Sequence, residues 1–567
     1  MKLKYIFSCL CILSALVVFS GCEDMLDTDS DRYAFEEDHD LKSPNDSLYS
    51  LMGILSQLQK IGDRYVIMGE LRGDLMTVSE DASIALKEIN AFNVSEDNSY
   101  REKYDYYNII NNCNYAISKM DTSIVFHTEK VMLPEFAAIK AIRAWTYWQM
   151  AQIYGKVYYM EEPILSLESS LAKYPEKDID ELAGILIEDL LPYVNVDRPD
   201  YGMIDGKYSY FFSVPVRMLL GDLYLFKNLY PQAAAMYHDQ IYEGYLITRN
   251  YASFWTTTVQ DAFNAQHGSS YRNEVMSIIP YSTSIKDFHS NLVRMSFNNT
   301  ASLLPVKGFM DEMALKPHFH AAELNGNITG YFEGDLRGSI KSGRIRYEIG
   351  DSYGTIQSKE GAKDLIYKYF NAATAITSAT DPENELLPYP YILTEIPIYR
   401  NPQLYLRYAE AVNRAGKPTL AFAVLKYGLN TTTINDPQKV NYSEIANNEP
   451  YIDFAISAEA ITNNVGTASR GRGLGISRDA SIFVIPDFTQ ENVDKARQDS
   501  IDWVETQILD EMAAETAYEG SRFFDLLRIS RHRDGHPAFM AEKVSRKYED
   551  SEGMKSLLMD INSWFIK

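Results

Sequence analysis

Apolar residues recur at intervals of three or four positions along much of the chain, which is the spacing of amphipathic helices. The first such stretch follows a group of capping residues at 43–46, and we expect it to end at Gly62. Its apolar positions are Leu48, Leu51, Leu55 and Leu58. A second stretch, residues 134–155, is bounded by a proline and a glycine and is apolar around most of its circumference. This helix is therefore predicted to be buried, with Trp145 and Trp148 in the core.

Two stretches have the spacing of the helix pairs in tetratricopeptide repeats. In residues 215–241 the pattern consists of Leu220, Gly221, Tyr224, Tyr230, Ala233 and Tyr237. Residues 403–430 repeat it with Ala409, Gly416, Ala421 and Leu425. The small residues let two helices approach closely, and the tyrosines fill the space between them. We therefore predict a mainly α protein with a tetratricopeptide-like helical-pair scaffold over residues 48–245 and 395–567, the last part including a C-terminal segment.

The two copies are separated by an insert, roughly residues 246–394, that has a different texture. It is rich in turn residues and holds short candidate strands, of which residues 274–282 are the clearest. Binding residues concentrate on irregular segments that a rigid scaffold carries. We therefore predict a large irregular, partly β insert that forms the ligand face.

Residues 1–21 have the organisation of a secretory signal peptide. Two lysines precede an apolar run from Ile6 to Phe19, which is too short to span a membrane comfortably. The run leads into FSGC, which resembles the bacterial lipoprotein signal and makes Cys22 the predicted site of lipidation. Ordinary secretion with an unmodified Cys22 is the alternative. Residues 22–47 hold ten acidic and two basic side chains, so they are predicted to be an acidic tether.

The charge of the whole chain narrows the choice of partners. Its 567 residues include 54 basic and 78 acidic side chains, a formal net charge of −24. This balance argues against nucleic acid, because binding phosphates needs a basic surface. No other apolar run is long enough to cross a bilayer, so we expect contact with a membrane through the lipid anchor only.

The cysteines leave no pair for a disulfide. Cys9 and Cys11 would be removed with the signal peptide, and Cys22 would carry lipid. Cys113 then stands alone, so the mature chain has no intramolecular disulfide. We predict that Cys113 is a small buried apolar residue rather than a nucleophile.

Motifs for catalysis are scarce. The His318–His320 and His532–His536 pairs could serve a metal, but neither has an evident third ligand. The chain also lacks the H-E-x-x-H, G-x-S-x-G and Walker patterns. We therefore predict that the protein is not an enzyme and holds no metal or cofactor. Paired carboxylates are defined in space rather than in sequence, so a glycan hydrolase stays an alternative.

Six motifs are spread along nearly the whole chain. They are GELRGD (69–74), AIRAWTY (141–147), NEVMSIIPYS (273–282), GDLRG (334–338), EIPIYRNPQLYLRYAEAVNRAG (395–416) and EGSRFFDLLR (519–528). Together with the leader they resemble the RagB/SusD family of outer-membrane nutrient-uptake lipoproteins of Bacteroidetes, in the order usual for that family. Two departures leave the subfamily open. Residues 156–164 lack the proline that often follows Tyr-Gly, and Met512-Ala513 replace a more basic helix segment.

The resemblance implies a location and a partner. The protein would be lipid-anchored in the outer membrane, facing the cell exterior, and would close as a lid over a SusC-like TonB-dependent transporter. The charged residues of the terminal motif need not touch ligand. We expect Arg522, Asp525 and Arg528 to fix the terminal segment within the scaffold, and Arg143 to belong to a buried ion pair.

Ligand contacts are predicted off the scaffold, in polar and turn-rich sequence. A sugar offers C–H groups to an aromatic face and hydroxyls to polar side chains. The candidates in the insert are Trp255, Tyr271, Tyr281, Phe288 and His289, with Trp255 as the platform. A local apolar core under the loops is the alternative for these residues. Arg72 and Asp74 could supply a polar end of the site, and a structural role for both is the alternative.

Three functions are compatible with these features. The first is a surface-exposed lipoprotein that binds oligosaccharides and delivers them to the transporter without chemistry. The second keeps this architecture but captures oligopeptides, which the presence of only five tryptophans keeps open. The third is a lipid-anchored surface glycan hydrolase.

Overall fold

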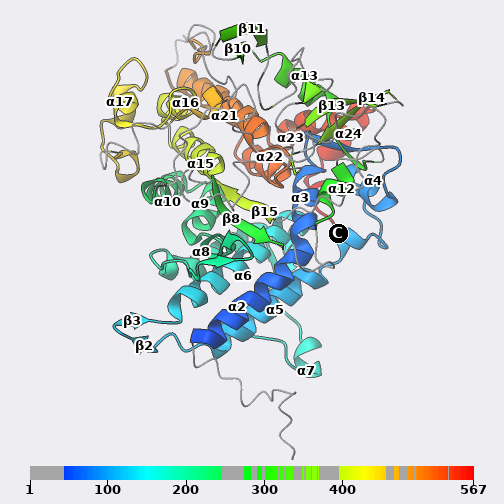
Figure 1. Ribbon diagram of the computed structural model, residues 1–567, viewed down its shortest axis with the longest axis vertical. Coiled ribbons are helices and arrows are strands. Elements are labelled where there is room, and N and C mark those ends of the chain that lie inside the picture. Colours follow the sequence, from blue (N-terminus) through cyan, green and yellow to red (C-terminus); the bar gives the residue numbers. More distant parts are fainter. Residues whose placement is uncertain are drawn as a thin grey trace, which may run out of the picture.

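A computed structural model describes residues 44–244, 395–454, 465–470 and most of 483–567, together with pieces of 274–369. The described chain is mainly helical, with short and scattered strands (Figure 1). This confirms the predicted fold class. Among the described residues, no helix combines the length and the apolar character that a membrane span requires.

The first part of the chain consists of helices, with short strand pairs in some of the connections between them. Its helices are α2 (Pro44–Leu58), α3 (Gly62–Glu70), α4 (Ile84–Asn90), α5 (Tyr104–Lys119), α6 (Leu133–Tyr154), α7 (Leu167–Ser170), α8 (Ile179–Leu190), α9 (Val216–Phe226) and α10 (Tyr230–Tyr242). Its strands are β1 (Met76–Val78), β2 (Val125–Phe126), β3 (Glu129–Lys130), β4 (Lys156–Tyr158), β5 (Glu176–Asp178), β6 (Met203–Ile204) and β7 (Lys207–Tyr208).

The predicted insert contributes most of the longer strands. Its described elements are β8 (Val275–Pro280), α12 (Leu292–Ser296), β9 (Leu303–Pro305), α13 (Lys307–Ala314), β10 (Phe319–Leu324), β11 (Asn327–Glu333), β12 (Glu348–Ile349), β13 (Tyr353–Ser358) and β14 (Gly361–Ile366). In Figure 1 several of these elements lie at the upper edge of the molecule, away from α2 and α5. The strand predicted at 274–282 is confirmed as β8.

The last part of the chain returns to helices. Its elements are β15 (Glu395–Arg400), α15 (Asn401–Arg414), α16 (Pro418–Lys426), α17 (Thr431–Ile434), α18 (Tyr442–Ile445), α20 (Thr467–Arg470), α21 (Val493–Thr516), α22 (Arg522–Arg531), α23 (His536–Ser545) and α24 (Ser551–Leu558). Single 3₁₀ turns are η2 (Gln59–Ile61), η3 (Ser99–Arg101), η4 (Leu191–Tyr193), η5 (Ser209–Phe212), η6 (Pro450–Ile452) and η7 (Ile561–Trp564).

The two predicted helix pairs are present and stack directly on each other. They are α9 with α10 and α15 with α16, and α10 packs against α15 although the insert separates them in sequence. Gly221 permits the close approach of α9 and α10, because a Cβ at this position would lie 2.4 Å from a ring carbon of Tyr237. The scaffold continues through α6 and α8 on one side and α21 on the other. This confirms the predicted helical-pair scaffold.

Helix α6 forms the centre of the core, as its sequence predicts. Every residue from 141 to 154 is buried. Gly155 ends the helix with a φ of +73°, a conformation that glycine adopts without strain. The buried Arg143 forms an ion pair with the partly exposed Asp189 at 2.8 Å. Cys113 is fully buried beside α6, which raises the pKa of its thiol to about 12 and confirms its predicted structural role.

One helix boundary was predicted wrongly. Gly62 does not end the first helical stretch, since the chain passes through η2 and Gly62 begins α3 with helical backbone angles. The glycine is required for packing instead. A Cβ there would lie 2.2 Å from the hydroxyl oxygen of Tyr281.

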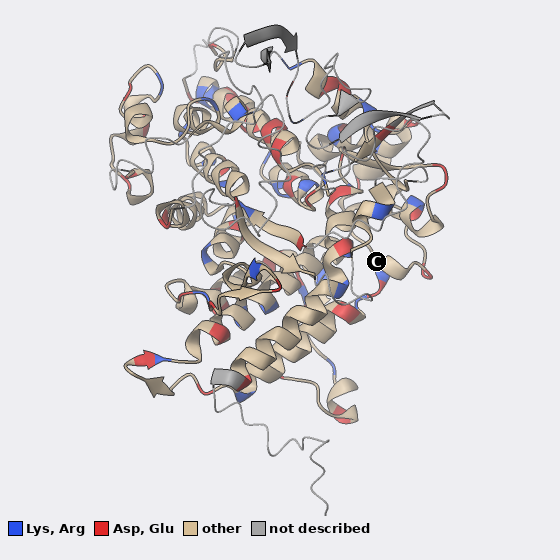
Figure 2. Ribbon diagram, viewed as in Figure 1, with Lys and Arg blue, Asp and Glu red and all other residues tan. Residues whose placement is uncertain are grey.

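Antiparallel strand pairs tie the insert to the scaffold. The β8–β15 pair aligns Ile279 with Ile396, and the β1–β9 pair aligns Met76 with Pro305. The other pairings are β2–β3, β4–β5, β6–β7, β10–β11 and β12–β13–β14. In Figure 2, α2 and β8 are almost free of charged residues, whereas Lys, Arg, Asp and Glu are dense along α21 and α22. The insert therefore joins the scaffold through an uncharged strand, β8, at one place and through charged side chains at α21 at another.

Candidate functional site

A buried carboxylate joins the GELRGD motif to the terminal motif. Glu70, at the end of α3, accepts hydrogen bonds from the backbone N–H groups of Tyr518 (3.1 Å), Gly520 (2.8 Å) and Ser521 (3.1 Å). Burial raises the pKa of Glu70 to about 7. The two segments approach closely because Gly69 has no side chain; a Cβ there would lie 1.8 Å from the carbonyl oxygen of Gly520. This part of the motif is therefore a structural joint.

Arg72 and Asp74 of the same motif have different surroundings. Arg72 is 1% exposed, donates to the carbonyl of Trp564 (2.7 Å) and lies 3.9 Å from the centre of the Phe523 ring. Asp74 accepts two hydrogen bonds from Arg522, at 2.6 and 2.8 Å. Burial acts to raise the pKa of Asp74, but the Arg522 guanidinium holds it below its usual value. Arg72 is thus enclosed by protein, which supports its structural alternative.

Buried ion pairs hold pieces of the insert to α21 and the residues that follow it. Arg337 contacts Asp335 at 2.7 Å and Glu515 at 2.8 Å. Lys368 contacts Glu519 at 2.5 Å. All these side chains are buried. Removing one partner would leave an uncompensated buried charge, so these pairs fix how the insert meets the scaffold.

The terminal motif is fixed in the same way. Arg528 lies 2.6 Å from Glu410 of α15 and 2.9 Å from Asp525. Asp525 also lies 2.9 Å from Arg407. Together with the Arg522–Asp74 pair, these contacts confirm that the charged residues of the motif serve the scaffold.

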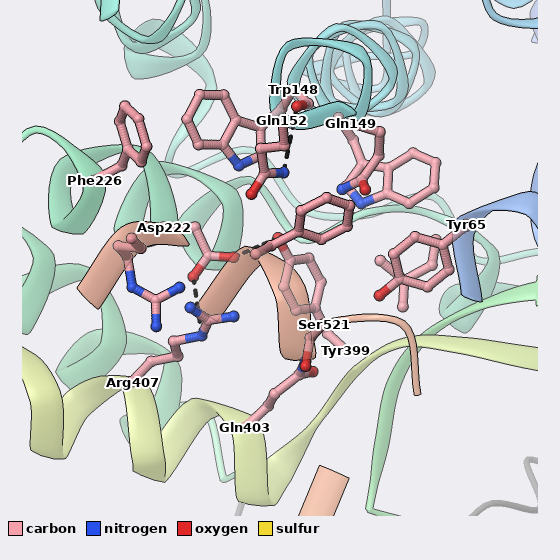
Figure 3. A pocket seen from close by; sticks show the side chains of 14 residues that line it. Tyr65, Trp148, Gln149, Gln152, Asp222, Phe226, Tyr399, Gln403, Arg407 and Ser521 are labelled. Atoms are coloured by element: carbon pink, nitrogen blue, oxygen red, sulfur yellow. Dashed lines mark hydrogen bonds and ion pairs between the residues drawn. The ribbon is translucent and has the colours of Figure 1, made fainter. Parts of the chain in front are cut away.

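A small cavity lies inside the scaffold, among α6, α9, α15 and α22 (Figure 3). Trp145 and Trp148 form part of its wall. Asp222 accepts a hydrogen bond from the hydroxyl of Tyr399 (2.9 Å) and lies 3.7 Å from Nε of Arg407. The volume of this interior cavity is about 30 Å³, which is room for about one water molecule. A sugar ring does not fit, and the predicted core position of both tryptophans is confirmed.

A much larger cleft, of about 460 Å³, opens between α13, α21 and α23. Its apolar lining consists of Leu75, Val306, Phe309, Met313 and Ala513. Its cations are Lys316, Arg522, Lys543, Arg546 and Lys547. Its acids are Asp74, Glu312 and Asp510. This volume lies within the range of small-molecule sites, although the lining is more charged than is usual, so the cleft is the candidate ligand site among the described residues.

Three of the five cations of the cleft lie at and just after the end of α23. Lys543 lies 3.2 Å from Asp510, and Arg546 lies 3.1 Å from Glu542. Lys547 donates to the carbonyls of Leu71 (2.6 Å) and Met76 (3.0 Å). Burial of its ammonium group lowers the pKa of Lys547 to about 7, although part of the side chain remains exposed.

The residues predicted to contact ligand have different positions in the structure. Tyr281 is 3% exposed and donates to the carbonyl of Gln59 (2.9 Å), so it fills the junction of β8 and η2 and does not present its ring to a ligand. Asp74 lines the cleft. Trp255, Tyr271, Phe288 and His289 lie outside the described residues, and their role stays a prediction.

The sequence did not single out Lys543, Arg546 and Lys547. Cations that recur three or four positions apart usually form a solvated helix face, so their spacing alone carries no site. What could have marked them is their position, shortly after the terminal motif whose Arg522 also lines the cleft. The apolar residues Phe309 and Met313 lie in the insert, where the ligand face is predicted.

No group of three or more His, Cys, Asp or Glu side chains within the described ranges is arranged to hold a metal. His532 contacts Glu505 at 2.9 Å, and His536 contacts the carbonyl of Ser530 at 3.0 Å. The two histidines therefore have separate partners. The side chains of His318 and His320 lie outside the described residues.

Several solved structures resemble this fold. A SusD superfamily protein from Bacteroides thetaiotaomicron aligns with a TM-score of 0.55 at 15% identity, covering 89% of this chain and 94% of that chain. A putative sugar binding protein from Bacteroides vulgatus has a TM-score of 0.53 and 17% identity, with 87% and 88% covered. For B. fragilis NanU the values are 0.51 and 15%, with 88% and 92% covered. No protein-family model and no curated protein matches the sequence. The chain has the fold of the SusD superfamily, as its motifs predict.

Proposed function

We propose that this protein is a surface-exposed lipoprotein that binds oligosaccharides and delivers them to a SusC-like TonB-dependent outer-membrane transporter, over which it closes as a lid. The observation that carries the proposal is the shared fold. It extends over 87% of the chain in the comparison with a protein described as a putative sugar binding protein. The sequence motifs, which resemble the RagB/SusD family along nearly the whole chain, add the transporter as the partner.

The cleft between α13, α21 and α23 is the place where the described residues could hold part of such a ligand. Its apolar side chains suit the C–H groups of a sugar ring, and its charged side chains suit hydroxyl and anionic groups. Asp74 belongs to this cleft. We keep Trp255 as the proposed platform, with Tyr271 and His289 beside it, and we assign Arg72 and Tyr281 to the scaffold.

The pKa values and contacts of two buried acids, Glu70 and Asp74, agree with binding without catalysis. Glu70 has a pKa of about 7, which is the range that a general acid needs. It is nevertheless held by backbone N–H groups and lines neither the interior cavity nor the cleft. Asp74 is tied to Arg522 and has a lowered pKa, so it is a poor proton donor at neutral pH. These two carboxyl groups therefore do not form an acid–base pair.

Lipidation at Cys22 would attach the protein to the outer membrane. Cys22 precedes α2 in the sequence, and α2 begins at the lower end of the molecule in Figure 1. The Cys22→Ala chain should appear in the medium or periplasm, because a lipid anchor is the expected means of attachment. Cell fractionation with detection of the protein checks this. Retention of the variant in the membrane fraction would contradict the lipoprotein proposal.

Calorimetric titration of the chain from residue 23 onward against an oligosaccharide panel tests the ligand class. We expect binding of at least one oligosaccharide, without turnover in the recovered ligand. Binding of oligopeptides but not of oligosaccharides would show that the ligand is a peptide. Release of shorter sugars would favour the hydrolase alternative. Trp255→Ala should weaken binding, whereas Tyr442→Ala, at an exposed position on α18, serves as the matched aromatic control.

A further inference from the structure

The cleft between α13, α21 and α23 carries more cations than acids in a chain whose net charge is −24. Its described lining has five cationic and three acidic side chains. Three of the cations, Lys543, Arg546 and Lys547, come from a single segment at the end of α23. A locally positive concave surface concentrates anions, and here it does so against the average charge of the protein.

The carboxylates that hold Lys543 and Arg546 are exchangeable. Asp510 is 42% exposed and Glu542 is 47% exposed, while the Arg546 side chain is itself 57% exposed. Ion pairs between exposed side chains contribute little to stability. Both cations can therefore turn from these partners to an anionic ligand group at small cost. The Arg522–Asp74 pair is largely buried and bidentate, so it forms a fixed part of the wall instead.

Lys547 supplies a less solvated donor. Two carbonyl oxygens, those of Leu71 and Met76, are its hydrogen-bond acceptors. An ammonium group has three N–H donors, so one remains for a ligand in the cleft. The positive charge is costly in this position, because the ammonium is buried and neutral carbonyls are its direct partners. The carboxylates of Asp74 and Glu70 act on this charge only from a distance, so a ligand anion would add a direct counter-charge.

The apolar part of the lining restricts what carries the anion. Phe309 and Met313 of α13, with Val306 before them, are buried side chains that border the cleft. Such a surface packs against C–H groups and does not hydrogen-bond. A bare inorganic anion would leave it uncovered, whereas a ring with one anionic substituent covers it while reaching the cations.

We infer that this cleft binds an acidic sugar residue, with its carboxylate or sulfate group at Lys543, Arg546 and Lys547. The C–H face of the ring lies toward Phe309 and Val306, the most exposed of the apolar lining residues. The inference rests on the proposed function, since it names the chemical class of the oligosaccharide that the protein captures.

Three probes that share one ring test it: glucuronic acid, glucose 6-sulfate and glucose. They are titrated calorimetrically into the chain from residue 23 onward. Glucuronic acid or glucose 6-sulfate should bind about tenfold more tightly than glucose, because hydrogen bonds to charged groups contribute more than neutral ones. Whichever of the two binds more tightly identifies the anionic group as a carboxylate or a sulfate, and either result supports the inference.

The Lys543→Gln/Arg546→Gln double variant should reduce this tenfold preference to about twofold or less. Arg546 is exposed and Lys543 is partly exposed, so the variant is expected to fold, and its thermal unfolding checks this. Lys307→Gln is the matched control, because Lys307 is 78% exposed on α13 and does not line the cleft. The control should keep the full preference.

Two results would overturn the inference while leaving the proposed function intact: glucose binding as tightly as its acidic counterparts, or a preference that survives in the double variant. If none of the three sugars and no member of the oligosaccharide panel binds, the proposed function itself fails and the inference fails with it.

Discussion

The interior cavity and the cleft differ in a way that separates packing from binding in this protein. The interior cavity is lined by many aromatic side chains, Trp145 and Trp148 among them, yet it encloses only about 30 Å³. The cleft has a single aromatic side chain among its described lining residues, Phe309, and a volume of about 460 Å³. Abundant aromatic rings therefore mark the core here, and the accessible volume lies where charged side chains gather.

The exposed arginine of the cleft, Arg546, also differs from Arg528 of the interior cavity. In the interior cavity Arg528 is bound by two buried carboxylates, Glu410 and Asp525. At the cleft Arg546 has one exposed partner, Glu542. Arg528 must keep its carboxylate partners, because losing one leaves an uncompensated buried charge. The exposed Arg546 pair contributes little to stability, so a ligand can rearrange it. Substitutions in the two places should therefore affect different properties.

The two largest effects on stability are expected for Trp148→Ala and Arg528→Ala. Trp148 is 4% exposed and packs edge-on against Phe226 with ring centres 4.8 Å apart. Truncation should lower the free energy of unfolding by about 3–5 kcal/mol, because it leaves a cavity in the core. Urea denaturation measures this change. Tyr104→Ala, at a position that is 72% exposed, should change stability by less than about 0.5 kcal/mol.

Arg528→Ala should destabilise the fold by about 3–5 kcal/mol, since it leaves Glu410 as a buried carboxylate without its guanidinium. The same denaturation experiment applies. Arg546→Ala is the matched control and should cost less than about 1 kcal/mol. If both arginine variants were equally stable, the distinction between locked and exchangeable pairs would be refuted.

Lys547→Met should change the pH dependence of stability. The folded pKa of Lys547 is about 7, below the ordinary value of 10.5, so between these values the unfolded chain binds an extra proton. Stability of the native protein should therefore rise with pH in this window, by up to about 1.4 kcal/mol per pH unit from this group. The variant lacks this contribution. The stability of both proteins is measured by urea denaturation between pH 7 and 9. Parallel curves would rule out the contribution of Lys547 to the pH dependence.

The smallest effect on stability belongs to the Lys543→Gln/Arg546→Gln double variant. We expect a loss of less than about 1 kcal/mol, because both ion pairs are partly exposed. Its effect should instead appear in the preference for acidic over neutral sugars. A large drop in melting temperature would show that these cations belong to the scaffold, as Arg528 does.

The scaffold was predictable because local spacing determines it. Gly221 and Tyr237 lie on neighbouring helices, so their complementarity is visible in a short stretch of sequence. The roles of Arg72 and Tyr281 were not predictable in the same way. Their partners, Trp564 and Gln59, are 492 and 222 positions away, and a single sequence contains no record of such contacts.

The cleft was missed for the same reason. It is assembled from residues near positions 74, 309, 513 and 546, each of which looks like an ordinary buried or solvated side chain in its own segment. Only the fold brings the apolar surface of α13 to the cations after α23. Trp255, Tyr271, Phe288 and His289 were identified from composition and lie outside the described residues, so their role stays a prediction.

The joint made by Glu70 has a consequence for the order in which the protein folds. Its carboxylate is synthesised early, but its four backbone donors follow 448 to 452 positions later. Contacts so distant in sequence form late, because closing the intervening loop costs entropy before any contact compensates for it. A nascent chain that ends before residue 518 would have to bury this acid without donors. Completion of the polypeptide is therefore the event that commits its first helices to their native packing, and we expect folding to finish after synthesis rather than during it.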